Sequence, residues 1–161
     1  MKVNKKYNCL FIGNAIVDVV SEVSFDFLEK QKIDVGSWRP VSINEINELQ
    51  EKMSNIWIAS GGSAANSAVG FSLLGGRSAF IGRVKSDDFG SLYINDLKEA
   101  NVDFISNPVD KGNETGRCLV YVSPDAQRSM RTYLGAASNL SPENLDINAV
   151  SYTHLRAHET T

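Results

Sequence analysis

The sequence predicts an α/β fold, and two observations lead to it. Two short apolar runs, at 7–13 and 78–82, end in glycine and have the composition of buried strands. Helical patterns follow at 65–74 and from Asp88 to Ala100, and a further short strand is predicted at 102–104. This alternation is typical of βαβ units, and a length of 161 residues suits one domain.

The first third of the chain predicts two strands and two helices. After the buried strand at 7–13, the β-branched stretch 16–23 is expected to continue as an exposed strand. A short helical turn is predicted at 26–30. Ser42 and Glu45 form a capping-box pattern ahead of apolar residues at near-helical spacing, which predicts a helix over 43–53.

The remaining elements alternate and then change character. A strand at 56–59 leads into two glycines, helix 65–74 ends at a second glycine pair, and Asp88 can cap the next helix. Strands at 117–122 and 129–134 are predicted to form a hairpin, and Ser141-Pro142 marks a helix start. The pattern therefore indicates an α/β layer that carries a small β-rich appendage.

Composition limits the classes of function. The chain is 42% hydrophobic and 22% charged with a net charge of −3, which favours small-molecule ligands over nucleic acid or anionic membranes. It has no apolar run of the roughly 20 residues that a spanning helix needs and no signal-peptide core, so a cytoplasmic protein is expected. Cys9 and Cys118 lie in apolar strands and are predicted to be buried, reduced thiols.

Residues 61–66, Gly-Gly-Ser-Ala-Ala-Asn, form the strongest candidate for a binding site. The glycines allow a ligand to approach the backbone, and the N–H groups in the first turn of the following helix lack intrahelical partners. Asn66 adds a hydrogen-bond donor and an acceptor. The alternative is a tight turn without a ligand.

Several ordered segments carry a family resemblance. They are Leu-Phe-Ile-Gly-Asn-Ala-Ile-Val-Asp at 10–18, the 61–66 motif, Ile-Gly-Arg-Val-Lys-Ser-Asp-Asp-Phe-Gly at 81–90, and the segments 115–122 and 132–136. Over roughly residues 5–148 the chain resembles the ribokinase-like (PfkB) carbohydrate and nucleoside kinases, above all the bacterial adenosine kinase-like members. The resemblance implies the N-terminal part of an α/β/α sandwich with a small β-strand lid, formed by strands near 14–23, 36–41 and 115–134.

The resemblance also implies a substrate site. Asp18 would hold the vicinal hydroxyls of a ribose or sugar, because a carboxylate can accept two hydrogen bonds, and Asn14 would lie beside it. The other substrate-binding residues implied are Gly61, Gly62, Ser63 and Asn66. An acid at a strand edge facing water remains the alternative for Asp18.

Two arginines and one acid have more open roles. Arg128 matches an arginine that can approach the transferring phosphoryl group, where a guanidinium can neutralise charge. Arg131 departs from the family pattern, and a solvated lid surface is the alternative for both arginines. Asp87 matches a family aspartate before a helix, and a structural role as an N-cap is favoured for Asp87 or Asp88.

The catalytic machinery is expected outside this chain. The resemblance implies a Gly-x-Gly-Asp motif in the C-terminal half of the family, with its aspartate as general base and its backbone forming an anion hole. The chain is expected to end before that motif, so no catalytic base is assigned within it. The intact parent would use ATP and Mg²⁺, whereas the chain alone is expected to be inactive. The segment 70–78 lacks a P-loop ending, and no dinucleotide-binding glycine motif follows the first strand.

These observations lead to one leading function and two alternatives. The leading function is the substrate-binding half of an ATP-dependent kinase that phosphorylates the hydroxymethyl group of an adenosine-like nucleoside. One alternative is a sugar kinase for ribose, fructose or a keto-sugar acid, and the other is a non-catalytic module that dimerises through the β lid. Residues 1–150 are assigned to the kinase domain and 151–161 to an adaptor-derived tail, whose His154 and His158 are not expected to bind metal.

Overall fold

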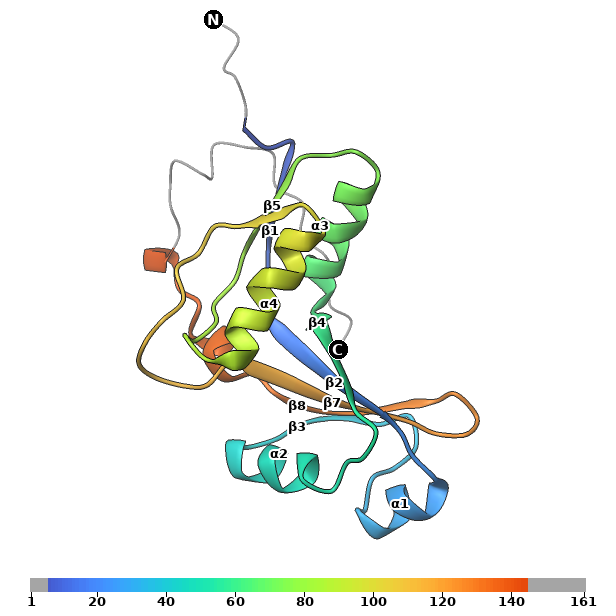
Figure 1. Ribbon diagram of the computed structural model, residues 1–161. Coiled ribbons are helices and arrows are strands. Elements are labelled where there is room, and N and C mark those ends of the chain that lie inside the picture. The colour runs from blue at the N-terminus through green and yellow to red at the C-terminus, as the bar shows by residue number, and fades with distance from the viewer. Residues whose placement is uncertain (1–5, 145–161) are drawn as a thin grey trace, which may run out of the picture.

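The computed structural model describes residues 6–144, which form two sheets joined by helices (Figure 1). The first sheet, here called the body sheet, is three-stranded and parallel in the order β1-β5-β6. Its strands are β1 (Cys9–Ile12), β5 (Ser78–Ile81) and β6 (Val102–Phe104). Helices α3 (Ser63–Leu73) and α4 (Asp88–Glu99) pack side by side on it. Together these elements form the body.

The second sheet is five-stranded, in the order β3-β8-β7-β2-β4, and is here called the lid sheet. It contains β2 (Ile16–Glu22), β3 (Trp38–Pro40), β4 (Trp57–Gly61), β7 (Gly116–Val122) and β8 (Arg128–Tyr133). Short helices α1 (Phe25–Lys30) and α2 (Ile43–Gln50) lie on one face of it (Figure 1). Two 3-10 turns follow β8, at Gly135–Asn139 and Pro142–Asn144.

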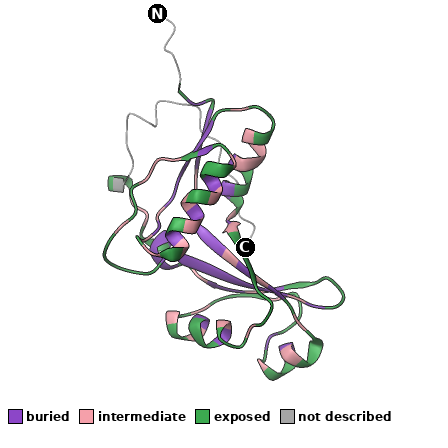
Figure 2. Cartoon of the chain, in the orientation of Figure 1, coloured by how far each residue is buried: buried purple, intermediate pink, exposed green. Residues whose placement is uncertain are grey.

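Each sheet has a main apolar core, and buried residues follow the strands of both (Figure 2). A smaller cluster of Ile16, Cys118, Val120 and Ala137 lies on the face of the lid sheet opposite α1 and α2. In the body, Phe11, Phe80 and Val102 pack against α3 and α4. In the lid, Val19 and Leu119 pack against α1 and α2. Phe89, in the first turn of α4, packs against both cores, so the N-terminal end of α4 is the joint between body and lid.

The expected α/β class and most elements are confirmed. Ser42 caps α2 by accepting a hydrogen bond from the Glu45 N–H at 3.2 Å, although α2 ends at Gln50 rather than near residue 53. Helix α3 begins two residues earlier than expected, at Ser63. Both cysteines are buried and outside any disulfide, and no helix in residues 6–144 is long and apolar enough to cross a membrane.

One sequence-based expectation was wrong, and two others are made more specific by the structure. The strand after residue 16 is not exposed, because Val17, Val19 and Ser21 on one face of β2 are fully buried. The N-cap of helix α4 was left open between Asp87 and Asp88, and the structure assigns it to Asp87, which accepts a hydrogen bond from the Gly90 N–H at 2.8 Å.

The expected β-strand lid is present and includes one segment more than expected. The expected segments 14–23, 36–41 and 115–134 do supply strands, but β4 joins them by pairing antiparallel with β2, so this sheet has more strands than the body sheet. The expected adaptor tail, with both histidines, and any helix continuing after 144 lie outside the described residues.

Candidate functional site

The candidate substrate residues meet where β4 leaves the lid and α3 begins in the body. Asp18 is on β2, opposite Ala59 of β4 and Cys118 of β7. Its side chain lies on the face of the lid sheet that α1 and α2 do not cover, since its neighbours Val17 and Val19 occupy the other face.

The two glycines of the turn allow this close arrangement. A Cβ on Gly61 would lie 2.4 Å from the Asp18 carboxylate oxygen, so Asp18 folds directly over the Gly61 backbone. A Cβ on Gly62 would lie 2.5 Å from the backbone carbonyl oxygen of Asn14, and Gly62 has a φ of 92°, which favours glycine. Glycine is therefore required at position 61 by the nearby Asp18 carboxylate, and at position 62 by the nearby Asn14 carbonyl and by the positive φ.

The other predicted residues surround the same turn. Ser63 is the first residue of α3, and the Asn66 N–H donates to the Gly62 carbonyl at 2.9 Å, in the first turn of that helix. Both side chains are exposed, and Asn14 is half-buried in the connection from β1 to β2. The structure thus brings Asn14, Asp18 and the 61–66 segment together.

Asp18 is an unusual carboxylate. Burial raises its pKa to about 6, and the positive charge of Arg128 opposes part of that rise. The carboxylate is ionised at neutral pH but only partly solvated, so a ligand that donates hydrogen bonds to it would replace lost water.

A row of apolar side chains lies next to Asp18 on the same face. The strand registers align one residue from each strand: Trp57, Val20, Val120, Met130 and Trp38. We call this row the apolar strip. It ends in the two tryptophans of the chain, which are 49% and 55% exposed, so the strip offers aromatic surface one row away from the carboxylate.

The two arginines occupy opposite faces of the lid sheet. Arg128 is exposed at the start of β8, on the face that carries Asp18. Arg131 pairs with Leu119 and is only 4% exposed, with its guanidinium donating to Ser37 and to the Met130 carbonyl. The alternative of a solvated surface is therefore wrong for Arg131, because strand alternation turns it toward the face that α1 and α2 cover.

Asp87 has a larger structural role than capping alone. Besides Gly90, its carboxylate accepts hydrogen bonds from the Thr115 N–H at 3.0 Å and from the Thr115 hydroxyl at 2.6 Å. Thr115 directly precedes β7 of the lid and is fully buried. Asp87 thus ties the body to the lid, which the sequence did not reveal because Thr115 lies 28 residues away.

Sequence analysis also missed Tyr93 and Asp96 of α4. The Tyr93 hydroxyl donates to the Gly61 carbonyl at 3.2 Å, and the Asp96 carboxylate accepts from the Ser60 N–H at 2.7 Å. Neither residue was among the predicted site residues. A hydroxyl at a fully buried position was the available signal, since such a group needs a partner.

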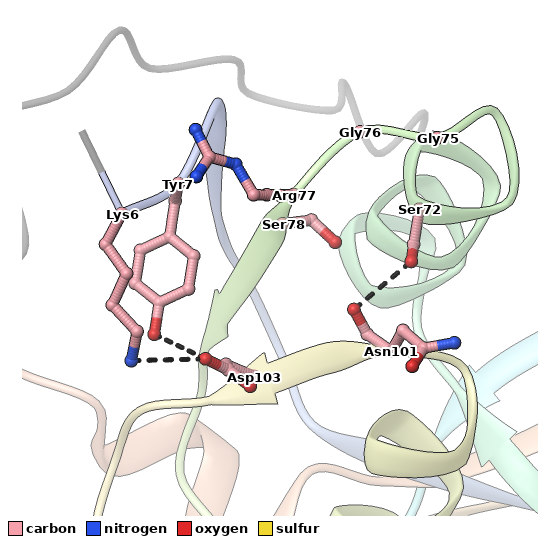
Figure 3. Close-up of a pocket in the computed structure, with 9 residues that line it drawn as sticks. All are labelled: Lys6, Tyr7, Ser72, Gly75, Gly76, Arg77, Ser78, Asn101 and Asp103. Atoms are coloured by element: carbon pink, nitrogen blue, oxygen red, sulfur yellow. Dashed lines mark hydrogen bonds and ion pairs between the residues drawn. The ribbon is translucent and has the colours of Figure 1, made fainter. Parts of the chain in front are cut away.

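A hollow of about 520 Å³ lies at the other end of the body (Figure 3). There Lys6 and Tyr7 both point toward Asp103, with the Tyr7 hydroxyl donating at 2.6 Å, and Ser72 donates to the Asn101 carbonyl. These polar groups bind one another. No group of three or more metal-ligating side chains lies together within residues 6–144.

Comparison with known proteins gives a consistent set of relatives. A family model described as pfkB family carbohydrate kinase matches residues 18–157. A probable fructokinase-6 from Arabidopsis thaliana is 36% identical over 90 residues, which are 56% of this chain and 23% of that protein.

Two solved structures match most of the chain. The adenosine kinase from Sinorhizobium meliloti has a TM-score of 0.83 and 39% identity, over 90% of this chain and 44% of its own. A probable sugar kinase from Rhizobium etli CFN 42 has a TM-score of 0.84 and 34% identity, over 91% and 44%. The chain therefore spans less than half the length of these relatives, and the ribokinase-like fold expected from the sequence is confirmed.

Proposed function

The chain belongs to the pfkB family of carbohydrate kinases, and from this premise we propose that it forms the substrate-binding part of an ATP-dependent kinase for an adenosine-like nucleoside. One observation carries the proposal: the partly buried Asp18 carboxylate lies over the Gly61-Gly62 turn and beside the apolar strip. The likeness to an adenosine kinase structure supports it.

Asp18 would hold the sugar part of the substrate. Its two oxygens can accept hydrogen bonds from two neighbouring hydroxyls, as in a ribose. Because the pKa of Asp18 is raised to about 6, its ionised form gains from donors that replace solvent. The exposed Asn66 side chain and the N–H groups in the first turn of α3 can add further contacts to hydroxyls.

The apolar strip favours a nucleoside over a free sugar. A purine is flat and can cover Trp57 and its neighbours, and an aromatic pair contributes about 0.5 to 1.5 kcal/mol beyond burial of area. A hexose carries hydroxyls on most carbons and would lose their hydration against apolar side chains. The strip lies one row from Asp18, so a ribose held by Asp18 could place its attached base against the strip.

Phosphoryl transfer would need groups beyond those described. We assign Arg128 to the phosphoryl side, where its charge can offset that of the transferred group. ATP with Mg²⁺ would supply the phosphoryl group. We further propose that the 161-residue chain alone has no kinase activity.

The alternatives keep specific support. The similarity to fructokinases favours a sugar such as fructose, because Asp18 would bind sugar hydroxyls equally well. A dimerising module would use the lid sheet, whose outer strands are β3 and β4. The face under α1 and α2 is already covered, so a second copy would have to pair with an edge or cover the apolar strip.

Intrinsic fluorescence tests the proposal directly, because both tryptophans of the chain lie on the strip. We expect adenosine to change the emission of the 161-residue chain and fructose to leave it unchanged. Asp18→Ala should abolish the response. Glu22→Ala is the matched control, since Glu22 is an exposed acid on the same face of β2.

The fluorescence results distinguish the nucleoside kinase, the sugar kinase and the dimerising module. A response to fructose and none to adenosine would favour the sugar kinase. A folded chain that responds to neither ligand, and that sediments as a dimer, would support the dimerising module and contradict the nucleoside site.

A further inference from the structure

Helix α4 contacts the chain where it leaves the lid for the body. Tyr93 and Asp96 are three residues apart, so they lie on one side of the helix. Asp96 accepts a hydrogen bond from the Ser60 N–H at 2.7 Å, and Tyr93 donates to the Gly61 carbonyl at 3.2 Å. Ser60 and Gly61, the two consecutive residues that lead into Gly62, are thus held by one rigid element.

The Tyr93 bond determines the orientation of a peptide group. The C=O of Gly61 and the N–H of Gly62 belong to the same planar trans peptide and point in opposite directions. Because the carbonyl points to Tyr93, the Gly62 N–H points away from α4. Gly61 also pairs with Ile16 of β2, but Gly62 lies beyond the end of β4, and glycines have more backbone freedom than other residues.

The surroundings of Tyr93 keep its hydroxyl in place as a donor. The ring is fully buried and packs against Phe80 and Phe104, with centroids 6.0 Å and 6.2 Å away. Burial, and to a smaller extent the negative charge of Asp18, raises the pKa of Tyr93 well above its ordinary value. The hydroxyl therefore stays protonated and donates to the carbonyl at any physiological pH.

We propose that Tyr93, assisted by Asp96, is a positioning residue that fixes the Gly61-Gly62 peptide for substrate binding. This inference rests on the proposed function of the turn. Tyr93 touches no substrate itself, and it acts by holding the backbone in the conformation that binding requires, so that less conformational freedom is lost when the ligand arrives.

The test compares two buried tyrosines. Tyr93→Phe removes the hydroxyl and keeps the ring. Tyr121→Phe is the matched control, because the Tyr121 hydroxyl is buried without a hydrogen-bond partner in the described part of the chain and lies on the covered face of the lid. Two readouts are needed: the NMR shift and hydrogen exchange of the Gly62 amide, and the affinity for adenosine.

We expect Tyr93→Phe to shift the Gly62 amide resonance, to speed its exchange, and to weaken adenosine binding about 3- to 10-fold, the equivalent of one hydrogen bond. Tyr121→Phe should leave the Gly62 amide unchanged and the affinity within about twofold. An unchanged Gly62 amide in Tyr93→Phe would overturn the inference.

The amide readout needs no ligand. If the unmodified chain binds neither adenosine nor fructose, the proposed function fails, while the Gly62 measurement still decides whether Tyr93 positions the turn.

Discussion

The two faces of the lid sheet differ in what their residues contribute. On the covered face, Val19, Leu119 and Tyr121 are fully buried under α1 and α2. On the open face, the strip ends in half-exposed tryptophans and Asp18 remains a poorly solvated carboxylate. A sheet with one face of each kind can gain its stability on the covered face and keep the open face for a ligand.

Adjacent valines give the most direct test of this difference. Val19 and Val20 point to opposite faces of β2, and only Val19 is fully buried. Val19→Ala should reduce the free energy of unfolding by about 2 to 3 kcal/mol, because it removes buried apolar surface and leaves a cavity. Val20→Ala should reduce the free energy of unfolding by less than half of that amount.

Urea unfolding of the two variants, followed by circular dichroism, measures the difference. Val20→Ala should weaken the binding of adenosine, whereas Val19→Ala should leave the affinity unchanged. Equal losses of stability in the two variants would mean that the open face is packed as firmly as the covered one.

Asp18→Asn should show that the Asp18 carboxylate on the open face lowers the stability of the folded chain. The pKa of Asp18 is raised from 3.8 to about 6, so the folded state holds its proton more tightly than the unfolded state. The wild-type chain therefore loses stability as pH rises from about 4 to 6, and the loss is complete above pH 6.

Asn does not titrate, so at pH 8 the variant should be about 1 to 2 kcal/mol more stable than wild type, after allowance for partial solvation. The gain should vanish near pH 4. Urea unfolding at several pH values checks this, and a gain that does not depend on pH would show that the carboxylate is not destabilised. Adenosine binding should be lost in the same variant.

Trp57→Leu should affect binding more than folding. Trp57 is half-exposed on the edge strand β4, so its replacement should change the free energy of unfolding by less than about 0.5 kcal/mol. Loss of aromatic contact with a purine should weaken adenosine binding about 2- to 10-fold. Calorimetry should measure this affinity, because the substitution removes one of the two fluorescent tryptophans. Unchanged affinity would remove the strip from the base-binding role.

The sequence predicted local features well because their causes are local. The Ser42 cap and the Gly61-Gly62 turn depend on residues within a few positions. The choice between Asp87 and Asp88 as cap could not be made, since two adjacent acids suit the position equally. Asp87 is distinguished from Asp88 by its hydrogen bonds to Thr115, which join segments that are distant in the sequence.

Strand partners and burial were harder to predict for a physical reason. Alternation shows that a strand has two faces, but it does not show what covers each face, so β2 was expected to be exposed and Arg131 was left on a solvated surface. The addition of β4 to the lid depends on pairing with β2, which its own sequence does not encode.

The smallest expected effect comes from the covered face. Tyr121 places its hydroxyl where no described residue pairs with it, and leaving a buried donor unpaired costs about 1 to 3 kcal/mol. Tyr121→Phe keeps the ring contact with Phe27, whose centroid lies 5.7 Å away, and removes only the unpaired group. The variant should therefore be equally stable or up to about 1 kcal/mol more stable in thermal and urea unfolding. If it were instead destabilised by more than about 1 kcal/mol, the hydroxyl would have a polar partner, and the covered face would carry more than apolar packing.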